Sequence, residues 1–309
     1  MNMTFNQFTA YDEERLNKYA SLRPIYISER QFINQFIWEN YYNTTYYCNN
    51  KYLIYVSNRD DNMIPMMPFC KLKDIPDVFT EIKDYWNNDL NLPLNMYFLD
   101  KPFIESLKAN PSFEEEFEII DDRDSYDYIY DAEQLKALRG KKFHKKRNHL
   151  NRFLRTYKGR YEYKTINCNN IEEVDAFFQI WLNNRGYEDI QDTIQSEDIG
   201  VREVFQNCNE LDCKLGSVYV DDVLQAFTIG TYDPSIECAF IHTEKANTQI
   251  TGLYNFINQQ FLINAFPDAK LVNREDDLGQ PGLRKSKLSY RPIRLEEKYF
   301  IKQKTSKKF

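Results

Sequence analysis

The densest run of ionisable side chains in this sequence lies at residues 271–292. Three consecutive acids, Glu275, Asp276 and Asp277, follow a short apolar stretch that is typical of a strand. After a glycine-containing turn, a helix-like segment carries three cations: Arg284, Lys285 and Lys287. Carboxylates at a strand end can act as general bases or hold an ammonium group, and clustered cations can hold a phosphate. We therefore expect a binding crevice at the carboxyl end of this strand. A surface loop and helix cross-linked by salt bridges is the alternative interpretation.

A second group of candidate residues lies on and after the preceding strand. His242 and Glu244 are two residues apart, so regular alternation would direct both side chains to one face, where either can share the role of base. Lys245 can hold a phosphate or steady the tetrahedral oxygen of an acyl-transfer reaction, and Tyr254 or Tyr290 can protonate the leaving group. A hydrogen-bonded core histidine and a packed core tyrosine are the corresponding structural interpretations of His242 and Tyr254.

A basic run interrupts an otherwise acidic chain. Residues 139–160 hold ten Lys and Arg and no acid, whereas the whole chain has a net charge of −7, so the remainder carries −17. Helical spacing separates an apolar face from a polar face, which includes the cations Lys141, Lys145, Arg152 and Arg155. We expect this polar face to bind a polyanion, such as the phosphates of a cofactor or a transfer RNA. A solvated connector helix and salt bridges to the acidic remainder are the alternatives.

Several classes of site have no support in the sequence. It contains no Gly-x-Ser-x-Gly motif, no P-loop and no dinucleotide fingerprint, and no cysteine stands beside a histidine. The six cysteines include no C-x-x-C pair and no histidine at zinc-ligand spacing, so we expect no metal site and free thiols in a reducing cytoplasm. The first residues do not resemble a signal peptide, and no run approaches ~18 apolar residues, so we expect a soluble cytoplasmic protein.

Length and periodicity predict two α/β domains joined by the basic helix. The first, at residues 1–138, has helical patterns at 29–42, 74–86 and 102–109, and strand patterns at 51–57, 63–69, 94–99 and 126–130. We place the connecting helix at 139–159 and the second domain at 160–309. The second domain has strands at 160–166, 215–220, 224–232, 236–244 and 270–273, helices at 171–182 and 194–207, a helix opened by Gly252, and a closing strand at 293–300. Asp221 and Asp222 mark a hairpin turn.

Three antiparallel strands followed by Gln249-Ile-Thr-Gly252 at a helix N-terminus resemble the layout of the GNAT acyltransferase fold. In that fold, the backbone N–H groups of the strand-to-helix turn hold the pyrophosphate of an acyl-coenzyme A. The resemblance implies that Gln249, Gly252 and Tyr254 lie at such a cofactor site, with Lys245 nearby. Tyr254 departs from the small residue that the GNAT motif has at its last position.

Four segments resemble a more specific family. They are Asn273-Arg-Glu-Asp-Asp-Leu-Gly279, Gly282-Leu-Arg-Lys-Ser-Lys-Leu-Ser-Tyr290, His242-Thr-Glu-Lys-Ala246 and Asn148-His-Leu-Asn151. Over residues 22–300 the chain resembles the bacterial family related to the C-terminal domain of phosphatidylglycerol lysyltransferase. The resemblance implies two GNAT-like domains in tandem, each a mixed, mostly antiparallel sheet flanked by helices, similar to Fem-type transferases that take an aminoacyl group from transfer RNA. The lipid-modifying relatives carry a membrane segment, and this sequence has none, which disfavours a lipid headgroup as the acceptor.

The leading hypothesis is a transferase that moves an acyl or aminoacyl group from acyl-coenzyme A or aminoacyl-tRNA to an amine or hydroxyl acceptor. A non-catalytic module that binds RNA through the basic helix is a second hypothesis. A protein-interaction module with a degenerate GNAT site is a third.

Overall fold

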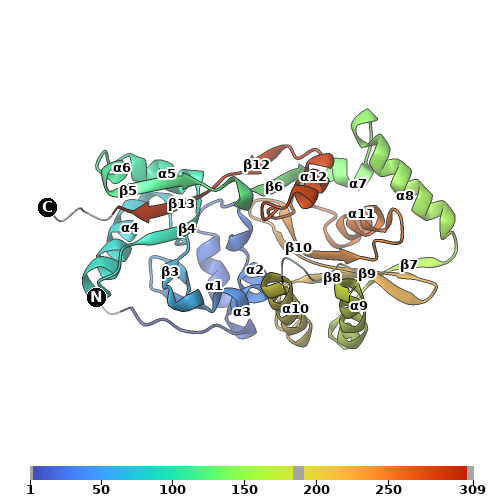
Figure 1. The fold of residues 1–309 in the computed structure, drawn as a ribbon, viewed down its shortest axis with the longest axis horizontal. Helices are drawn as coiled ribbons and strands as arrows, with labels where there is room; N and C mark the ends of the chain where they lie inside the picture. The colour runs from blue at the N-terminus through green and yellow to red at the C-terminus, as the bar shows by residue number, and fades with distance from the viewer. Residues whose placement is uncertain (1–2, 184–190, 305–309) are drawn as a thin grey trace. The chain divides into compact units, whose positions relative to one another are not determined.

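The chain forms two compact units in a computed structural model, which describes residues 3–183 and 191–304 (Figure 1). Unit 1 comprises residues 1–127 together with 296–309, and unit 2 comprises residues 128–295. The units therefore differ from the segments 1–138, 139–159 and 160–309 that composition indicates. The basic helix belongs to unit 2, and the C-terminal strand belongs to unit 1.

Unit 1 contains two three-stranded sheets, β1-β2-β3 and β4-β13-β5. Its strands are β1 (Thr44–Cys48), β2 (Leu53–Ser57), β3 (Ile64–Pro65), β4 (Asn95–Asp100), β5 (Phe117–Asp121) and β13 (Lys298–Gln303). Its helices are α1 (Glu13–Ala20), α2 (Phe32–Ile37), α3 (Glu39–Tyr42), α4 (Ile75–Asp84), α5 (Lys101–Lys108) and α6 (Phe113–Glu116). β13 pairs antiparallel with both β4 and β5, so this sheet needs a strand from the far end of the sequence. The expectation that residues 293–300 close the second sheet is therefore wrong for β13.

A buried ion cluster fixes the start of β13 inside unit 1. The Lys298 ammonium lies 2.8 Å from an Asp127 carboxylate oxygen and 2.7 Å from a Glu29 carboxylate oxygen. Burial raises the pKa of the Glu29 carboxyl to about 8, although the ammonium opposes this shift. Asp127 also accepts a hydrogen bond from the Ser28 amide at 2.6 Å. This cluster ties β13 to the segment before α2.

Unit 2 is built on a seven-stranded sheet of order β12-β6-β11-β10-β9-β8-β7. The strands are β6 (Asp127–Asp131), β7 (Tyr161–Thr165), β8 (Lys214–Val220), β9 (Val223–Asp233), β10 (Cys238–Ala246), β11 (Leu271–Asn273) and β12 (Arg294–Glu296). β10 and β11 are parallel, and β7 to β10 are antiparallel. Asp221 and Asp222 both have positive φ angles, as a two-residue hairpin between β8 and β9 requires, so the predicted turn is confirmed.

Helices cover both faces of this sheet (Figure 1). They are α7 (Ala132–Ala137), α8 (His144–Thr156), α9 (Ile171–Asn183), α10 (Gln191–Gln206), α11 (Leu253–Ala265) and α12 (Pro281–Ser289). α11 packs on one face through the predicted apolar stripe of Leu253, Phe256, Ile257 and Phe261, all buried. α9 and α10 lie on the other face, where Phe177, Phe178 and Phe205 contact Phe227 of β9. None of the helices within the described ranges has the length and apolar character needed to cross a bilayer.

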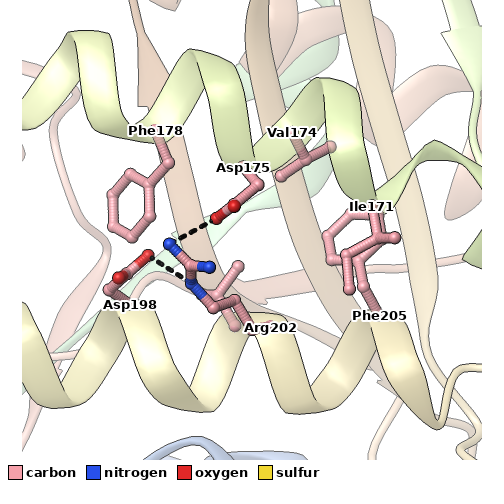
Figure 2. A pocket seen from close by; sticks show the side chains of 8 residues that line it. Ile171, Val174, Asp175, Phe178, Asp198, Arg202 and Phe205 are labelled. Atoms are coloured by element: carbon pink, nitrogen blue, oxygen red, sulfur yellow. Dashed lines mark hydrogen bonds and ion pairs between the residues drawn. The ribbon is translucent and has the colours of Figure 1, made fainter.

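The two helices α9 and α10 are held together by an ion pair and a disulfide. Figure 2 shows Arg202 of α10 between Asp198 and Asp175, with the Arg202–Asp175 distance at 2.6 Å. The void beside them measures about 10 Å³, which is room for one water molecule and not for a substrate. Cys168 and Cys208 form a disulfide that joins the segment before α9 to the segment after α10. The expectation that all six cysteines are free thiols is therefore wrong for these two.

Candidate active site

The candidate site lies at the carboxyl ends of the parallel strands β10 and β11, where a bulge changes the direction of the β10 side chains. Ile241 pairs with Gly230 and Thr243 pairs with Ile229, so His242 is the extra residue. Ile241 packs in the core around α11 and Glu244 bonds to Asn258 of α11, so these two face the same helix although they are three residues apart. The His242 ring lies parallel to that of Phe240, on the opposite face. The expectation that His242 and Glu244 share a face is therefore wrong, because the bulge interrupts the alternation.

His242 and Glu275 form a hydrogen-bonded pair on the face covered by α9 and α10. His242 Nδ1 lies 2.9 Å from Glu275 Oε1, and His242 Nε2 lies 2.9 Å from Thr231 Oγ1. The His242 side chain is 1% exposed and that of Glu275 is 16% exposed, so Glu275 is the solvent-accessible member. Glu275 has a left-handed backbone with φ of 56°, and its amide donates to Asn273 Oδ1 at 2.6 Å. This local turn directs the carboxylate toward β10.

A further set of residues forms a continuous chain of contacts between β10, α9, α10 and the start of α11, and together with His242 and Glu275 we call them the hairpin-side cluster. Lys245 lies 2.8 Å from the Glu197 carboxylate of α10 and 4.7 Å from the centroid of the Trp181 ring. The Trp181 indole donates to the Tyr254 hydroxyl at 3.3 Å. Thr243 Oγ1 also lies 3.5 Å from Glu197. The predicted residues Lys245 and Tyr254 thus meet in one cluster, through two partners that sequence reasoning did not identify.

A second set of charges lies on the α11 side of the sheet, and we call it the α11-side cluster. Its members are Glu244, Arg274, Asn255, Asn258, Tyr290 and Lys146. Glu244 accepts from Arg274 at 2.9 Å and from Asn258 at 3.0 Å. The buried Tyr290 hydroxyl accepts from Asn255 at 2.6 Å, and burial raises the pKa of Tyr290 to about 12. Sequence reasoning missed Arg274 and Lys146, although both stand inside the segments that it selected.

Asp277 converges with Arg284 of α12, but the two satisfy one another, as the salt-bridged alternative predicts. Arg284 donates two hydrogen bonds to the fully buried Asp277, at 2.7 and 2.8 Å, and Tyr128 donates a third. Burial alone would raise the pKa of the Asp277 carboxyl, but the bonds from Arg284 and Tyr128 hold it below its ordinary value. The Lys287 ammonium donates to the backbone carbonyls of Arg274, at 2.5 Å, and Asp276.

These contacts give the loop after β11 a rigid shape. Asp276 accepts from the Leu278 amide at 3.2 Å, and Lys285 is exposed on α12. Glu275 is therefore positioned by the bonded side chains of Asp277, Arg284 and Lys287. Lys285 makes none of these bonds and is the solvated cation of α12.

Gly252 serves the packing of α8 against the start of α11. Its φ is 90°, and a Cβ built on it would lie 2.1 Å from the His149 carbonyl oxygen and 3.1 Å from Phe153 Cβ. The His149 carbonyl oxygen of α8 therefore packs directly against this glycine. Gln249 is exposed, and its amide donates to Asn247 Oδ1 at 2.9 Å. The absence of a side chain at Gly252 is needed for this helix packing, and the expected acyl-coenzyme A site at Gln249 and Gly252 stays a prediction.

The outer face of α8 carries the predicted cations. Lys145, Arg152 and Arg155 are exposed on one side of the helix, and Lys141 is exposed just before it. Phe143, Leu150 and Phe153 are buried on the other side, as the periodicity predicts. Across residues 3–183 and 191–304, none of these four cations lies within ion-pair distance of a carboxylate. We call Lys141, Lys145, Arg152 and Arg155 the basic stripe.

Unit 2 has a sheet in which β10 and β11 are parallel, a helix that enters after β10, and a bulge beside the strand ends. These features are those of the tandem GNAT-like acyltransferase fold. The family described as "Phosphatidylglycerol lysyltransferase, C-terminal" matches residues 21–302, and the chain belongs to it. The resemblance seen in the sequence is confirmed.

Three similar proteins illustrate the relationship. A conserved protein of unknown function from Bacteroides thetaiotaomicron is 29% identical, with a TM-score of 0.89 over 98% of this chain and 100% of that one. L-PGS from Bacillus licheniformis is 12% identical, with a TM-score of 0.67 over 97% and 94% of the two chains, which shows the same fold. The uncharacterised protein MYCGA3080 of Mycoplasmoides gallisepticum is 28% identical over 180 residues. That alignment spans 58% of this chain and only 56% of the relative's length.

Proposed function

We propose that this chain transfers an aminoacyl group from a charged transfer RNA to an amine or hydroxyl acceptor. Membership of a family described by a lysyltransferase supports aminoacyl transfer. The observation that carries the proposal is the combination of the His242–Glu275 pair at the strand ends with an unpaired basic stripe in the same unit.

The donor is inferred from two features of α8. The basic stripe offers four exposed cations to a polyanion, and transfer RNA carries a regular array of phosphates. The His149 carbonyl oxygen of α8 also packs directly against Gly252, and a carbonyl oxygen repels an anion such as a coenzyme A pyrophosphate. Both features favour transfer RNA over acyl-coenzyme A as the donor.

Glu275 is assigned as the general base. The acceptor amine or hydroxyl attacks the ester carbonyl carbon of the donor, and the Glu275 carboxylate takes its proton as the new bond to carbon forms. The ester bond to the ribose then breaks, and the ribose oxygen leaves with a proton. Tyr254, half-buried in the same cluster and hydrogen-bonded to the Trp181 indole, is assigned as the group that supplies that proton. His242 positions Glu275, because both of its ring nitrogens are engaged.

The test is a transfer assay with mixed aminoacyl-tRNA labelled in the amino acid, a panel of small amines and phosphatidylglycerol vesicles as acceptors, and acetyl-coenzyme A as the competing donor. We expect label to move from transfer RNA to one acceptor class, and no transfer from acetyl-coenzyme A. Transfer from acetyl-coenzyme A alone would overturn the donor assignment.

A non-catalytic RNA-binding module is the second candidate, because the charged groups of the site are largely bonded to one another. If the protein is such a module, its RNA affinity should fall steeply with salt and should be lost in the double variant Lys145→Gln, Arg152→Gln. The transfer assay should then show no label on any acceptor. Lys71→Gln with Lys73→Gln, which removes two exposed charges from unit 1, is the control for the change in net charge.

A further inference from the structure

Lys146 lies on the inner side of α8, although Lys145 before it is exposed. Its ammonium nitrogen is 3.7 Å from the centroid of the Tyr290 ring, and the Arg274 guanidinium lies 4.9 Å from the same centroid. Two cations therefore share one buried aromatic ring. The attraction of each cation to the ring offsets only part of the cost of removing it from water.

The α11-side cluster has an excess positive charge. Glu244 is bonded to Arg274 and to Asn258, and it is the acid of the cluster. No carboxylate within residues 3–183 or 191–304 lies at ion-pair distance from the Lys146 ammonium. Burial and the positive charge of Arg274 lower the pKa of Lys146 to about 8, while Glu244 opposes this shift. The cluster is thus one negative charge short of neutrality.

The position of Lys146 indicates where such a charge would come from. Lys146 follows Lys145 of the basic stripe directly, so it lies at the edge of the surface that faces a bound polyanion. The exposed residues around it on α8 are polar: His144, Asn148, His149 and Asn151. This polar surface suits a nucleic-acid backbone and offers no apolar area for the acyl chains of a lipid.

We infer that Lys146, supported by Arg274 and Tyr290, forms a phosphate subsite that takes one backbone phosphate of an RNA lying along the basic stripe. The inference rests on the proposed function, because it assigns a contact to the proposed donor. A bound phosphate supplies the missing negative charge next to the ammonium. It also draws the RNA from the outer face of α8 toward the α11-side cluster.

The first experiment measures the chemical reactivity of Lys146 in the whole protein. Acetic anhydride is applied at pH 8 with and without uncharged transfer RNA, and acetylation of each lysine is read by mass spectrometry. We expect RNA to protect Lys146 at least fivefold, and Lys73, which lies in unit 1, to be unaffected. Unchanged acetylation of Lys146 by RNA that is demonstrably bound would overturn this inference and leave the proposed function intact. Protection by phosphatidylglycerol vesicles but not by RNA would also overturn it, in favour of a lipid headgroup.

The second experiment uses the pH dependence of RNA affinity. Lys146→Met should weaken RNA binding roughly fivefold at pH 7. It should also reduce the magnitude of the slope of log affinity against log salt by about 1, which corresponds to the loss of one phosphate contact. At pH 9 the wild-type ammonium is largely lost, so the wild type and Lys146→Met should converge. Tyr290, Arg274 and Glu244 are the other ionisable groups that face Lys146. Burial raises the pKa of Tyr290 to about 12, and the pKa of Arg274 is raised although burial opposes it, so neither side chain changes its charge between these pH values.

Two variants make the result specific. Lys146→Arg keeps its charge at pH 9 and should retain the affinity that the wild type loses. Lys145→Met should weaken binding equally at both pH values, because Lys145 is exposed on the stripe. Equal affinity of Lys146→Met and wild type at pH 7, with normal thermal unfolding, would overturn the subsite. Failure of the wild type to bind RNA at all would overturn both this inference and the proposed function.

Discussion

His242 Nδ1 lies 2.9 Å from Glu275 Oε1, a bond that joins the bulge of β10 to the loop after β11. If Glu275 is the base, Glu275→Gln should reduce the rate of aminoacyl transfer by roughly 10²–10⁴-fold while leaving RNA affinity unchanged. Single-turnover transfer and filter binding measure the two quantities. Glu237→Gln, which neutralises an exposed acid at the end of the turn before β10, should keep the wild-type rate. A Glu275→Gln rate within threefold of wild type would remove Glu275 from the chemistry.

Asp277 and Arg284 are assigned a structural role, which stability measurements can separate from substrate binding. Arg284→Met leaves the Asp277 carboxylate buried without its bidentate partner, so we expect a loss of about 3 kcal/mol in the free energy of unfolding. Lys285→Met, one residue along α12 and exposed, should stay within about 0.5 kcal/mol of wild type. Urea denaturation gives both values. Equal stability of the two variants would show that Arg284 is not needed to hold the loop.

Gly252 and Gly282 provide a matched pair of glycines. Gly252→Ala places a methyl group 2.1 Å from the His149 carbonyl oxygen at a φ of 90°, and we expect a loss of about 3 kcal/mol in unfolding free energy. Gly282→Ala meets nothing within 4 Å and lies in helix α12, so it should gain about 0.5 kcal/mol. Thermal unfolding tests the opposite signs. A stable Gly252→Ala protein with altered acetyl-coenzyme A affinity would restore the cofactor interpretation of this turn.

The disulfide between Cys168 and Cys208 closes a loop with a sequence separation of 40. Loop-closure entropy predicts that Cys168→Ser costs about 4 kcal/mol in unfolding free energy under oxidising conditions. The double variant with Cys208→Ser should cost no more, because either change removes the same bond. Excess dithiol should bring the wild type to the stability of the variants. A Cys168→Ser protein that unfolds at the same urea concentration as oxidised wild type would show that this bond contributes no stability.

Glu29 makes stability depend on pH in a defined direction. Its folded pKa of about 8 is above the ordinary value of 4.5, so the folded state keeps a proton that the unfolded state releases between these pH values. This contribution to stability is complete below pH 4.5 and is lost as pH rises through 8. Urea midpoints at pH 5 and pH 8.5 should therefore differ more for wild type than for Glu29→Gln. An identical pH dependence of the two proteins would contradict the assignment.

The elements of unit 2 were largely predictable, because each has a clear period and short turns separate the strands. The apolar stripe of α11 and the Asp221–Asp222 turn follow from local spacing and turn chemistry alone. The sequence also indicated that acids and cations meet after β11. It could not indicate that Asp277 and Arg284 neutralise each other, because that pairing depends on how the loop folds back on α12.

Other features depend on tertiary geometry that no local pattern encodes. The bulge at His242 inserts one residue into an unbroken strand pattern, so strict alternation placed His242 and Glu244 on one face. Lys146 is one of ten similar cations in the basic run, and only the helix rotation relative to Tyr290 distinguishes it. The disulfide joins two cysteines that lack any recognisable spacing motif.

The placement of β13 between β4 and β5 has a consequence for the order of folding during synthesis. Unit 2 is one contiguous stretch, so every strand within it is available before residue 298 leaves the ribosome. Until that moment β4 and β5 lack the neighbour that lies between them, and Asp127 and Glu29 lack their cation. The part of the protein that is translated first is therefore the part that matures last. A chain that ends before residue 298 would leave a folded unit 2 attached to an unfinished unit 1.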